Sequence, residues 1–139
     1  MSLERTFSII KPDAVAAGNA GNILAMLEAA GFRILALRMT KLTQEQAEGF
    51  YAVHREKGFF PGLVKFMTEG RIIVMALERE AAISKLREVM GATNPANAAE
   101  GTIRKKYATS IERNCIHGSD APETAAVELA YFFNSIDLQ

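Results

Sequence analysis

The sequence predicts an α+β domain in which helices cover a four-stranded antiparallel sheet with split β-α-β connectivity. Strand-like and helix-like segments follow one another in the order β-α-β-(α-α)-β-α-loop-β-α. Residues 72–77 (IIVMAL) form a continuous apolar run, which is typical of a central strand buried on both faces. No linker, repeat or low-complexity stretch divides the 139 residues, so we expect residues 1–139 to form a single domain.

The first part of the chain predicts two strands with a helix between them. Residues 3–10 are predicted to form a strand that ends at Lys11-Pro12, because proline disfavours its continuation. Residues 22–30 predict a helix, with Gly31 at the position where helices commonly end. Residues 32–42 alternate apolar residues with polar or long ones, as a strand does.

The second part predicts three helices before the last strand. Thr43 and Gln46 have the spacing of a capping box and predict a helix to about residue 53, followed by a short helix over residues 62–68. Residues 81–90 predict a helix that stops at Gly91. Residues 92–101 lack periodicity, and a loop of that size in a compact domain is usually functional. A short strand at residues 115–116 and a helix over residues 121–133 follow.

Composition and charge exclude several classes of function. Sixteen basic and sixteen acidic side chains cancel, so no overall field attracts nucleic acid or an anionic membrane. Cys115 is the only cysteine, which excludes an internal disulfide and fits a reducing compartment. Strand alternation would place it on the same face as His117, and we expect it to be a small buried thiol. The sequence has no signal peptide and no membrane-length apolar run, so we expect a cytoplasmic protein.

The most informative segment runs from Asn114 to Asp120 (NCIHGSD) and leads into the last helix. Its histidine, His117, lies close to a helix start, where backbone N–H groups favour anions. Glu128 follows two helical turns later and is expected to orient one imidazole nitrogen, directly or through Ser119. Neutral imidazole is a good nucleophile near pH 7, so the segment points to phosphoryl chemistry. From spacing alone, an ordinary solvated histidine remains the commoner reading.

Two further expectations concern the backbone of this segment. Gly118 is expected to let the chain turn sharply after the histidine. Asp120 and Glu123 have the spacing of a helix N-cap and its reciprocal N3 carboxylate, which predicts a capping box at the start of the last helix.

The segment Asn114-x-x-His117-Gly-Ser-Asp resembles the active-site signature of the nucleoside diphosphate kinases. The similarity covers essentially all of the chain, in the family's order and spacing. The other matching segments are residues 6–15 (TFSIIKPDAV), Tyr51, residues 59–60 (FF), residues 62–64 (GLV), residues 90–95 (MGATNP) and residues 101–104 (GTIR). The sequence is identified as a member of this family, whose ferredoxin-like fold has the shape predicted above.

The resemblance implies a two-step, ping-pong transfer. His117 would take the γ-phosphoryl group of a nucleoside triphosphate such as ATP as a phosphohistidine, and a nucleoside diphosphate would then retrieve it. Lys11 and Asn114 match residues that contact the ribose, and Lys11 also matches one that contacts the transferring phosphoryl group. Tyr51 matches a tyrosine that lines the reacting centre. Ser119 and Glu128 complete the expected catalytic set.

The resemblance also implies the nucleotide-binding residues. Arg87, Thr93 and Arg104 match positions that bind phosphates, which fits the absence of a glycine-rich Gly-x-x-x-x-Gly-Lys-Ser/Thr loop. Phe59 matches the residue that stacks on the base, and Ile111 matches the position that closes its other side. Stacking tolerates every base, because each one offers a π-face.

Mg²⁺ is the expected cofactor, and members of the family assemble as homo-oligomers. We expect the substrate phosphates and water to hold the ion, with Asp120 reaching it through water and no direct protein ligand. The chain ends soon after Phe133, which favours the bacterial tetramer over a hexamer or dimer. The chain departs from the family at Ala121, Glu100 and Lys105-Lys106, none of which touches the expected chemistry.

Two alternatives use the same scaffold differently. A non-catalytic nucleotide- or RNA-binding module would need exposed aromatic residues on central strands and a basic face, and the sequence offers little of either. A phosphohistidine carrier would use His117 on a protein partner and would leave Phe59 and Ile111 without a role. His54, the other histidine, is expected to be a polar residue near the site rather than the nucleophile.

Overall fold

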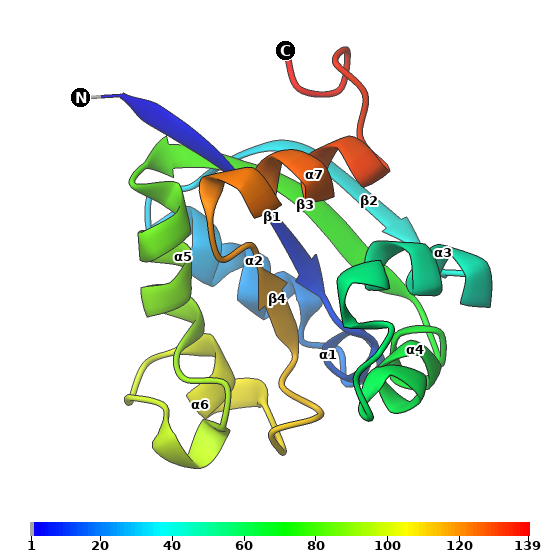
Figure 1. Ribbon diagram of the computed structural model, residues 1–139. Coiled ribbons are helices and arrows are strands. Elements are labelled where there is room, and N and C mark those ends of the chain that lie inside the picture. The colour runs from blue at the N-terminus through cyan, green and yellow to red at the C-terminus, as the bar shows by residue number, and fades with distance from the viewer. Residues whose placement is uncertain (1) are drawn as a thin grey trace.

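The computed structural model describes residues 2–139 (Figure 1). Its strands are β1 (Leu3–Ile10), β2 (Arg33–Thr40), β3 (Ile72–Glu80) and β4 (Ile116–Gly118). They form one sheet in the order β2-β3-β1-β4, and every neighbouring pair is antiparallel. This strand order, with helices in the crossovers, is the ferredoxin-like arrangement that the sequence predicted.

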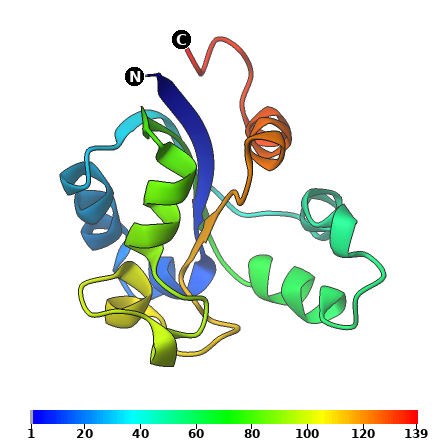
Figure 2. The same cartoon turned by 60° about the vertical axis from the view of Figure 1, so that its left-hand side comes forward.

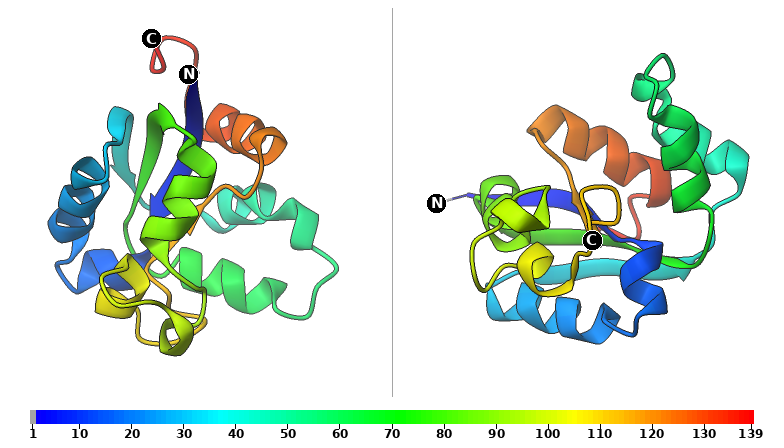
Figure 3. Two further views of the ribbon diagram at one scale, coloured as in Figure 1. Left: turned by 90° about the vertical axis from the view of Figure 1, so that its left-hand side faces the viewer. Right: turned by 90° about the horizontal axis from the view of Figure 1, so that it is seen from below.

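Helices cover both faces of the sheet, which Figure 2 and Figure 3 show nearly edge-on. One face carries α1 (Pro12–Ala16), α2 (Ala20–Ala29), α5 (Ala82–Met90) and α6 (Ile103–Tyr107). The other carries α3 (Gln44–Phe50), α4 (Phe60–Met67) and α7 (Pro122–Phe132). Short 3-10 turns lie at Ala52–His54 and Pro95–Asn97. No helix within residues 2–139 has both the length and the apolarity that crossing a membrane requires.

The two helical layers explain why β3 has no polar alternation. Its side chains point in turn into two separate cores, one on each face of the sheet. Ile73, Met75 and Leu77 belong to the core under α2 and α5. Ile72, Val74 and Ala76 belong to the core under α3, α4 and α7.

Local signals located some helix ends well and missed the shortest helices. The capping box of α3 is present: the Thr43 hydroxyl accepts from the Gln46 backbone N–H (3.1 Å), and Gln46 Oε1 accepts from the Thr43 N–H (2.9 Å). The predicted helix to residue 53 stops at Phe50 and continues as a 3-10 turn. The five-residue helices α1 and α6 were not predicted, because so few residues show no period.

The predicted relation between Cys115 and His117 is wrong. Cys115 has φ = 64°, so the backbone takes a left-handed turn immediately before β4 and the alternation starts only at Ile116. Cys115 and Ile116 are therefore both buried in the core under α5 and α6. The prediction that Cys115 is a buried thiol is confirmed. His117 points to the opposite face, beside Phe7 and Phe50.

Two predictions for the residues after His117 are also wrong. The N-cap of α7 is Ala121, which has no capping side chain, and Pro122 occupies the first turn, so Asp120 and Glu123 do not form a capping box. Gly118 is not at a positive φ angle. It is needed for close packing instead, because a Cβ atom there would lie 2.8 Å from Leu86 Cδ2.

We expect Gly118→Ala to destabilise the fold by about 1–3 kcal/mol, because the added methyl group overpacks the contact between β4 and α5. Thermal or urea unfolding would measure the change. Gly21→Ala is the matched control: nothing lies within 4 Å of a Cβ atom at that helical position, so stability should rise by a few tenths to about 1 kcal/mol. Equal effects of the two substitutions would contradict the packing argument.

Candidate functional site

His117 is held in the middle of β4 and packed between aromatic rings. It pairs with Ile9 of β1, the next strand of the sheet. Its imidazole lies edge-on to Phe50, with the ring centroids 5.7 Å apart, and 6.1 Å from Phe7. The side chain is about 20% exposed, so one part of the ring is accessible while the rest is enclosed. The sequence does not indicate Phe7 or Phe50 as neighbours of His117, because nothing in the chain shows which residue a buried aromatic ring will contact.

Glu128 of α7 holds one nitrogen of that ring. Its Oε1 atom lies 2.8 Å from His117 Nε2 and also accepts a hydrogen bond from the Ser119 hydroxyl at 2.7 Å. A carboxylate can only accept, so a neutral imidazole donates from Nε2 and keeps its lone pair on Nδ1. Of the two routes that the sequence predicted, the direct contact between Glu128 and the imidazole is present. Ser119 does not bridge them; its hydroxyl supports the Glu128 carboxylate instead.

Tyr51 lies at the end of α3 with its ring edge-on to Phe50, at 4.8 Å between centroids. Its side chain is buried, and its hydroxyl has no hydrogen-bond partner among residues 2–139. Burial and the negative charge of Glu128 both raise the pKa of the phenol. Tyr51 is thus a neutral donor kept near Glu128, as expected for a residue at the reacting centre.

Lys11 and Asn114 form a buried polar pair at the junction of β1 and the turn before β4. Lys11 Nζ donates to Asn114 Oδ1 at 2.8 Å, and Asn114 Nδ2 donates to the Ile111 carbonyl at 2.9 Å. Burial and the charge of Arg104 lower the pKa of Lys11 to about 8, and Asp13 partly opposes them. The pair brings together two segments more than a hundred residues apart, as the resemblance implied.

Arg104 is buried and bonded to the protein itself. Its guanidinium donates to the carbonyl oxygens of Asn114 (3.2 Å), Gly91 (3.0 Å) and Ile116 (2.7 Å). Burial lowers its pKa, and the charge of Arg87 contributes. A guanidinium has five N–H donors, so two remain for an anion. Arg104 therefore has a structural role in the turn before β4, and its phosphate-binding role stays a prediction.

Two cavities contain the predicted nucleotide-binding residues. A cavity of about 450 Å³ between α5 and the start of α6 is lined by Arg87, Thr93 and Arg104. A second cavity, of about 270 Å³, contains Lys11, Phe59, Ile111 and Asn114, together with Leu63, which the prediction did not include among the binding residues. We call the first the cationic cavity and the second the aromatic cavity. The bond from Arg104 to Asn114 connects them.

The aromatic cavity has an unusually exposed lining. Phe59 is 56% exposed and Ile111 is 49% exposed, while Phe60, next in the chain, packs into the core. Exposed large apolar side chains that converge on one cavity are typical of a ligand site. The His54 ring is tilted by 57° against that of Phe59, with 5.3 Å between the centroids, so His54 lies beside this cavity.

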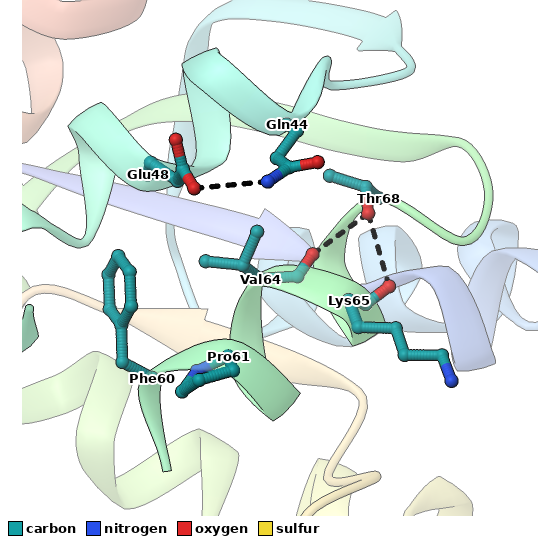
Figure 4. A pocket seen from close by; sticks show the side chains of 7 residues that line it. All are labelled: Gln44, Glu48, Phe60, Pro61, Val64, Lys65 and Thr68. Carbon is teal, nitrogen blue, oxygen red and sulfur yellow. Dashed lines mark hydrogen bonds between the residues drawn. The ribbon is translucent and has the colours of Figure 1, made fainter. Parts of the chain in front are cut away.

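A third cavity, of about 310 Å³, lies between α3 and α4 and contains none of the predicted residues (Figure 4). Two of its polar side chains are bonded locally: Gln44 donates to Glu48, and the Thr68 hydroxyl donates to the Val64 carbonyl. Because none of the predicted site residues lines it, we place this cavity outside the candidate site.

Comparison with known proteins agrees with this geometry. The sequence profile of the nucleoside diphosphate kinase family matches residues 4–138. The chain belongs to the nucleoside diphosphate kinase family. It is 61% identical over 136 residues to the nucleoside diphosphate kinase of Nitratidesulfovibrio vulgaris, covering 98% of each chain. It is 58% identical over 138 residues to that of Rhizobium meliloti, covering 99% of each.

Solved structures of this family share the fold. The Aquifex aeolicus nucleoside diphosphate kinase superposes with a TM-score of 0.97 at 41% identity, covering 99% of this chain and all of that one. The Halobacterium salinarum enzyme, solved in complex with CDP, gives a TM-score of 0.94 at 38% identity, covering 99% of this chain and 92% of that one. The family and the fold predicted from the sequence are thereby confirmed.

We expect Lys11 to titrate near pH 8 in the folded protein, which NMR of lysine-labelled protein would detect. Because this pKa lies below the ordinary 10.5, the charged form is disfavoured in the folded state. That penalty is fully present below pH 8 and disappears between pH 8 and 10.5. The stability of wild type relative to Lys11→Met should therefore rise over this interval, and a constant difference would contradict the burial of a charged Lys11.

Proposed function

We propose that this chain transfers the γ-phosphoryl group of a nucleoside triphosphate to a nucleoside diphosphate through a phosphohistidine on His117. The observation that carries the proposal is the contact of His117 Nε2 with Glu128, which leaves the lone pair on Nδ1. In the first step Nδ1 attacks the γ-phosphorus and the bond to the β,γ-bridging oxygen breaks, so the diphosphate leaves. In the second step an acceptor diphosphate attacks the phosphohistidine and restores the imidazole.

The cationic cavity supports the phosphate half of this proposal. Arg87, Arg104 and Lys11 would neutralise charge on the transferring group, where most catalysis in phosphoryl transfer resides. Thr93 would add a hydroxyl donor and Tyr51 a neutral phenol. These groups come from separate elements, as expected for a protein without a phosphate-binding glycine-rich loop.

The aromatic cavity supports the nucleoside half. Phe59 and Ile111 would enclose the base by apolar contact, and Lys11 with Asn114 would face the ribose. A phosphohistidine carrier would need no such cavity, and family membership does not favour the binding-module alternative.

Mg²⁺ is part of the proposal, bound together with the substrate. Residues 2–139 hold no group of three His, Cys, Asp or Glu side chains that could bind a metal, and the cationic cavity offers positive and hydroxyl groups. These residues fit a nucleotide that brings its own ion, held by phosphates and water, with Asp120 as an exposed carboxylate beside Ser119. The ion would shield phosphate charge. We further propose a cytoplasmic homo-oligomer, with a tetramer favoured.

Intact mass after brief incubation with ATP and Mg²⁺ tests the reaction. Wild type should gain about 80 Da as an acid-labile phosphate, and added GDP should remove it as GTP appears. His117→Ala should gain nothing, while the control His54→Ala should react like wild type. A phosphate that no nucleoside diphosphate removes would favour the carrier, and no phosphate on wild type would refute the proposal.

Phe59→Ala should raise KM for every nucleotide by roughly five- to fiftyfold with little change in kcat. The reason is that base stacking is lost equally in the substrate complex and in the transition state. Steady-state kinetics with purine and pyrimidine diphosphates would show this. A large loss with only one base would contradict recognition by stacking alone.

A further inference from the structure

Asp13 is a charged residue that contacts the turn before β4, and the proposed reaction gives it no role. It follows Lys11-Pro12 and lies in the first turn of α1. Part of its side chain is buried. Its two carboxylate oxygens have different surroundings, and both bear on residues of the reaction.

The first oxygen holds the turn before β4. Asp13 Oδ2 accepts a hydrogen bond from the Cys115 backbone N–H at 3.1 Å. The carbonyl of Cys115 accepts from the Lys11 backbone N–H at 2.9 Å. The left-handed Cys115 is thus bonded on both sides by the Lys11–Asp13 segment. This turn sets the directions of Asn114 before it and of His117 after it, because a left-handed residue breaks the strand alternation.

The second oxygen, Asp13 Oδ1, is buried and is left without a hydrogen-bond donor among residues 2–139. A buried carboxylate oxygen without a donor is tolerated where cations compensate its charge. The negative charge of Asp13 partly offsets the lowering of the Lys11 pKa by burial and by Arg104. The pKa of Arg113 is raised mainly by its hydrogen bond with Glu69, to which Asp13 adds a smaller contribution.

Few other groups compensate the positive charge of the buried Lys11 ammonium. Burial and the charge of Arg104 from α6 act against its ammonium, whereas Asp13 acts in its favour. Its hydrogen-bond acceptor, Asn114, is neutral. Glu112 lines the same aromatic cavity but is exposed. Asp13 is therefore the main carboxylate that keeps this buried lysine positive.

We propose that Asp13 is a positioning residue for the phosphotransfer site, which holds the Cys115 turn between Asn114 and His117 and keeps the neighbouring Lys11 ammonium charged. The inference rests on the proposed function of His117 and Lys11. It separates two actions of one side chain, a geometric one through Oδ2 and an electrostatic one through its charge.

Two substitutions separate these actions. Asp13→Asn keeps an oxygen that can accept from Cys115 N–H and removes the charge, whereas Asp13→Ala removes both. The readout is the pH dependence, from pH 6.5 to 9, of kcat/KM for phosphoenzyme formation from ATP, measured beside thermal unfolding. Glu28→Gln, at an exposed carboxylate on α2, is the control for loss of one negative charge.

Removing an anion lowers the pKa of a nearby lysine, so the alkaline limb of Asp13→Asn should move to lower pH. Its rate relative to wild type should fall roughly three- to tenfold between pH 6.5 and 8.5, with the melting temperature nearly unchanged. Asp13→Ala should also be slower at pH 6.5 and should melt earlier. Glu28→Gln should follow wild type throughout.

Two results would overturn the inference. If the ratio of kcat/KM between Asp13→Asn and wild type stayed constant across this pH range, the charge of Asp13 would not act through Lys11. Wild-type rates for Asp13→Ala at pH 6.5 would show that the turn does not need the carboxylate. Failure of the proposed function is distinguishable from both, because wild type itself would then form no phosphoenzyme.

Discussion

The turn at Cys115 is the constraint on which the rest of the site depends. A non-glycine residue at φ = 64° costs about 1–2 kcal/mol and persists only when its surroundings hold it. Here the surroundings are Asp13, the Lys11 backbone and the Arg104 guanidinium, which bonds the carbonyls on both sides of Cys115. The turn presents Ile116 to one core and His117 to the other, so the nucleophile leaves the sheet on the face that carries Glu128.

The same contacts bring buried cations to the place where phosphates would lie. Lys11 and Arg104 both have lowered pKa values, because burial disfavours their charge and Lys11 also faces Arg104. Such a site is unfavourable for the isolated protein and favourable for an anionic ligand, since a bound phosphate would compensate charges that the fold leaves only partly paired.

The nucleophile has the opposite kind of environment. Phe7 and Phe50 enclose the imidazole, and Glu128 with Ser119 holds one nitrogen, so the ring has a defined orientation and tautomer before any substrate arrives. Helix α3 supplies Phe50 and helix α7 supplies Glu128, and both helices pack on one face of the sheet although they are distant in the chain (Figure 1). Phe7 comes from β1, and Ser119 follows β4.

The sequence by itself determined the antiparallel α+β fold, because the apolar run of β3 and the capping box of α3 are local signals. Through its resemblance it also named His117, Lys11, Asn114, Arg104 and Glu128 as one set. It placed Cys115 on the wrong face, assigned a turn to Gly118 and predicted a capping box at Asp120, because each of these depends on contacts with distant segments. Only the tertiary structure decided that Arg104 bonds three carbonyls and that Asp13 supports the turn, since a hydrogen bond across a hundred residues has no period in the chain.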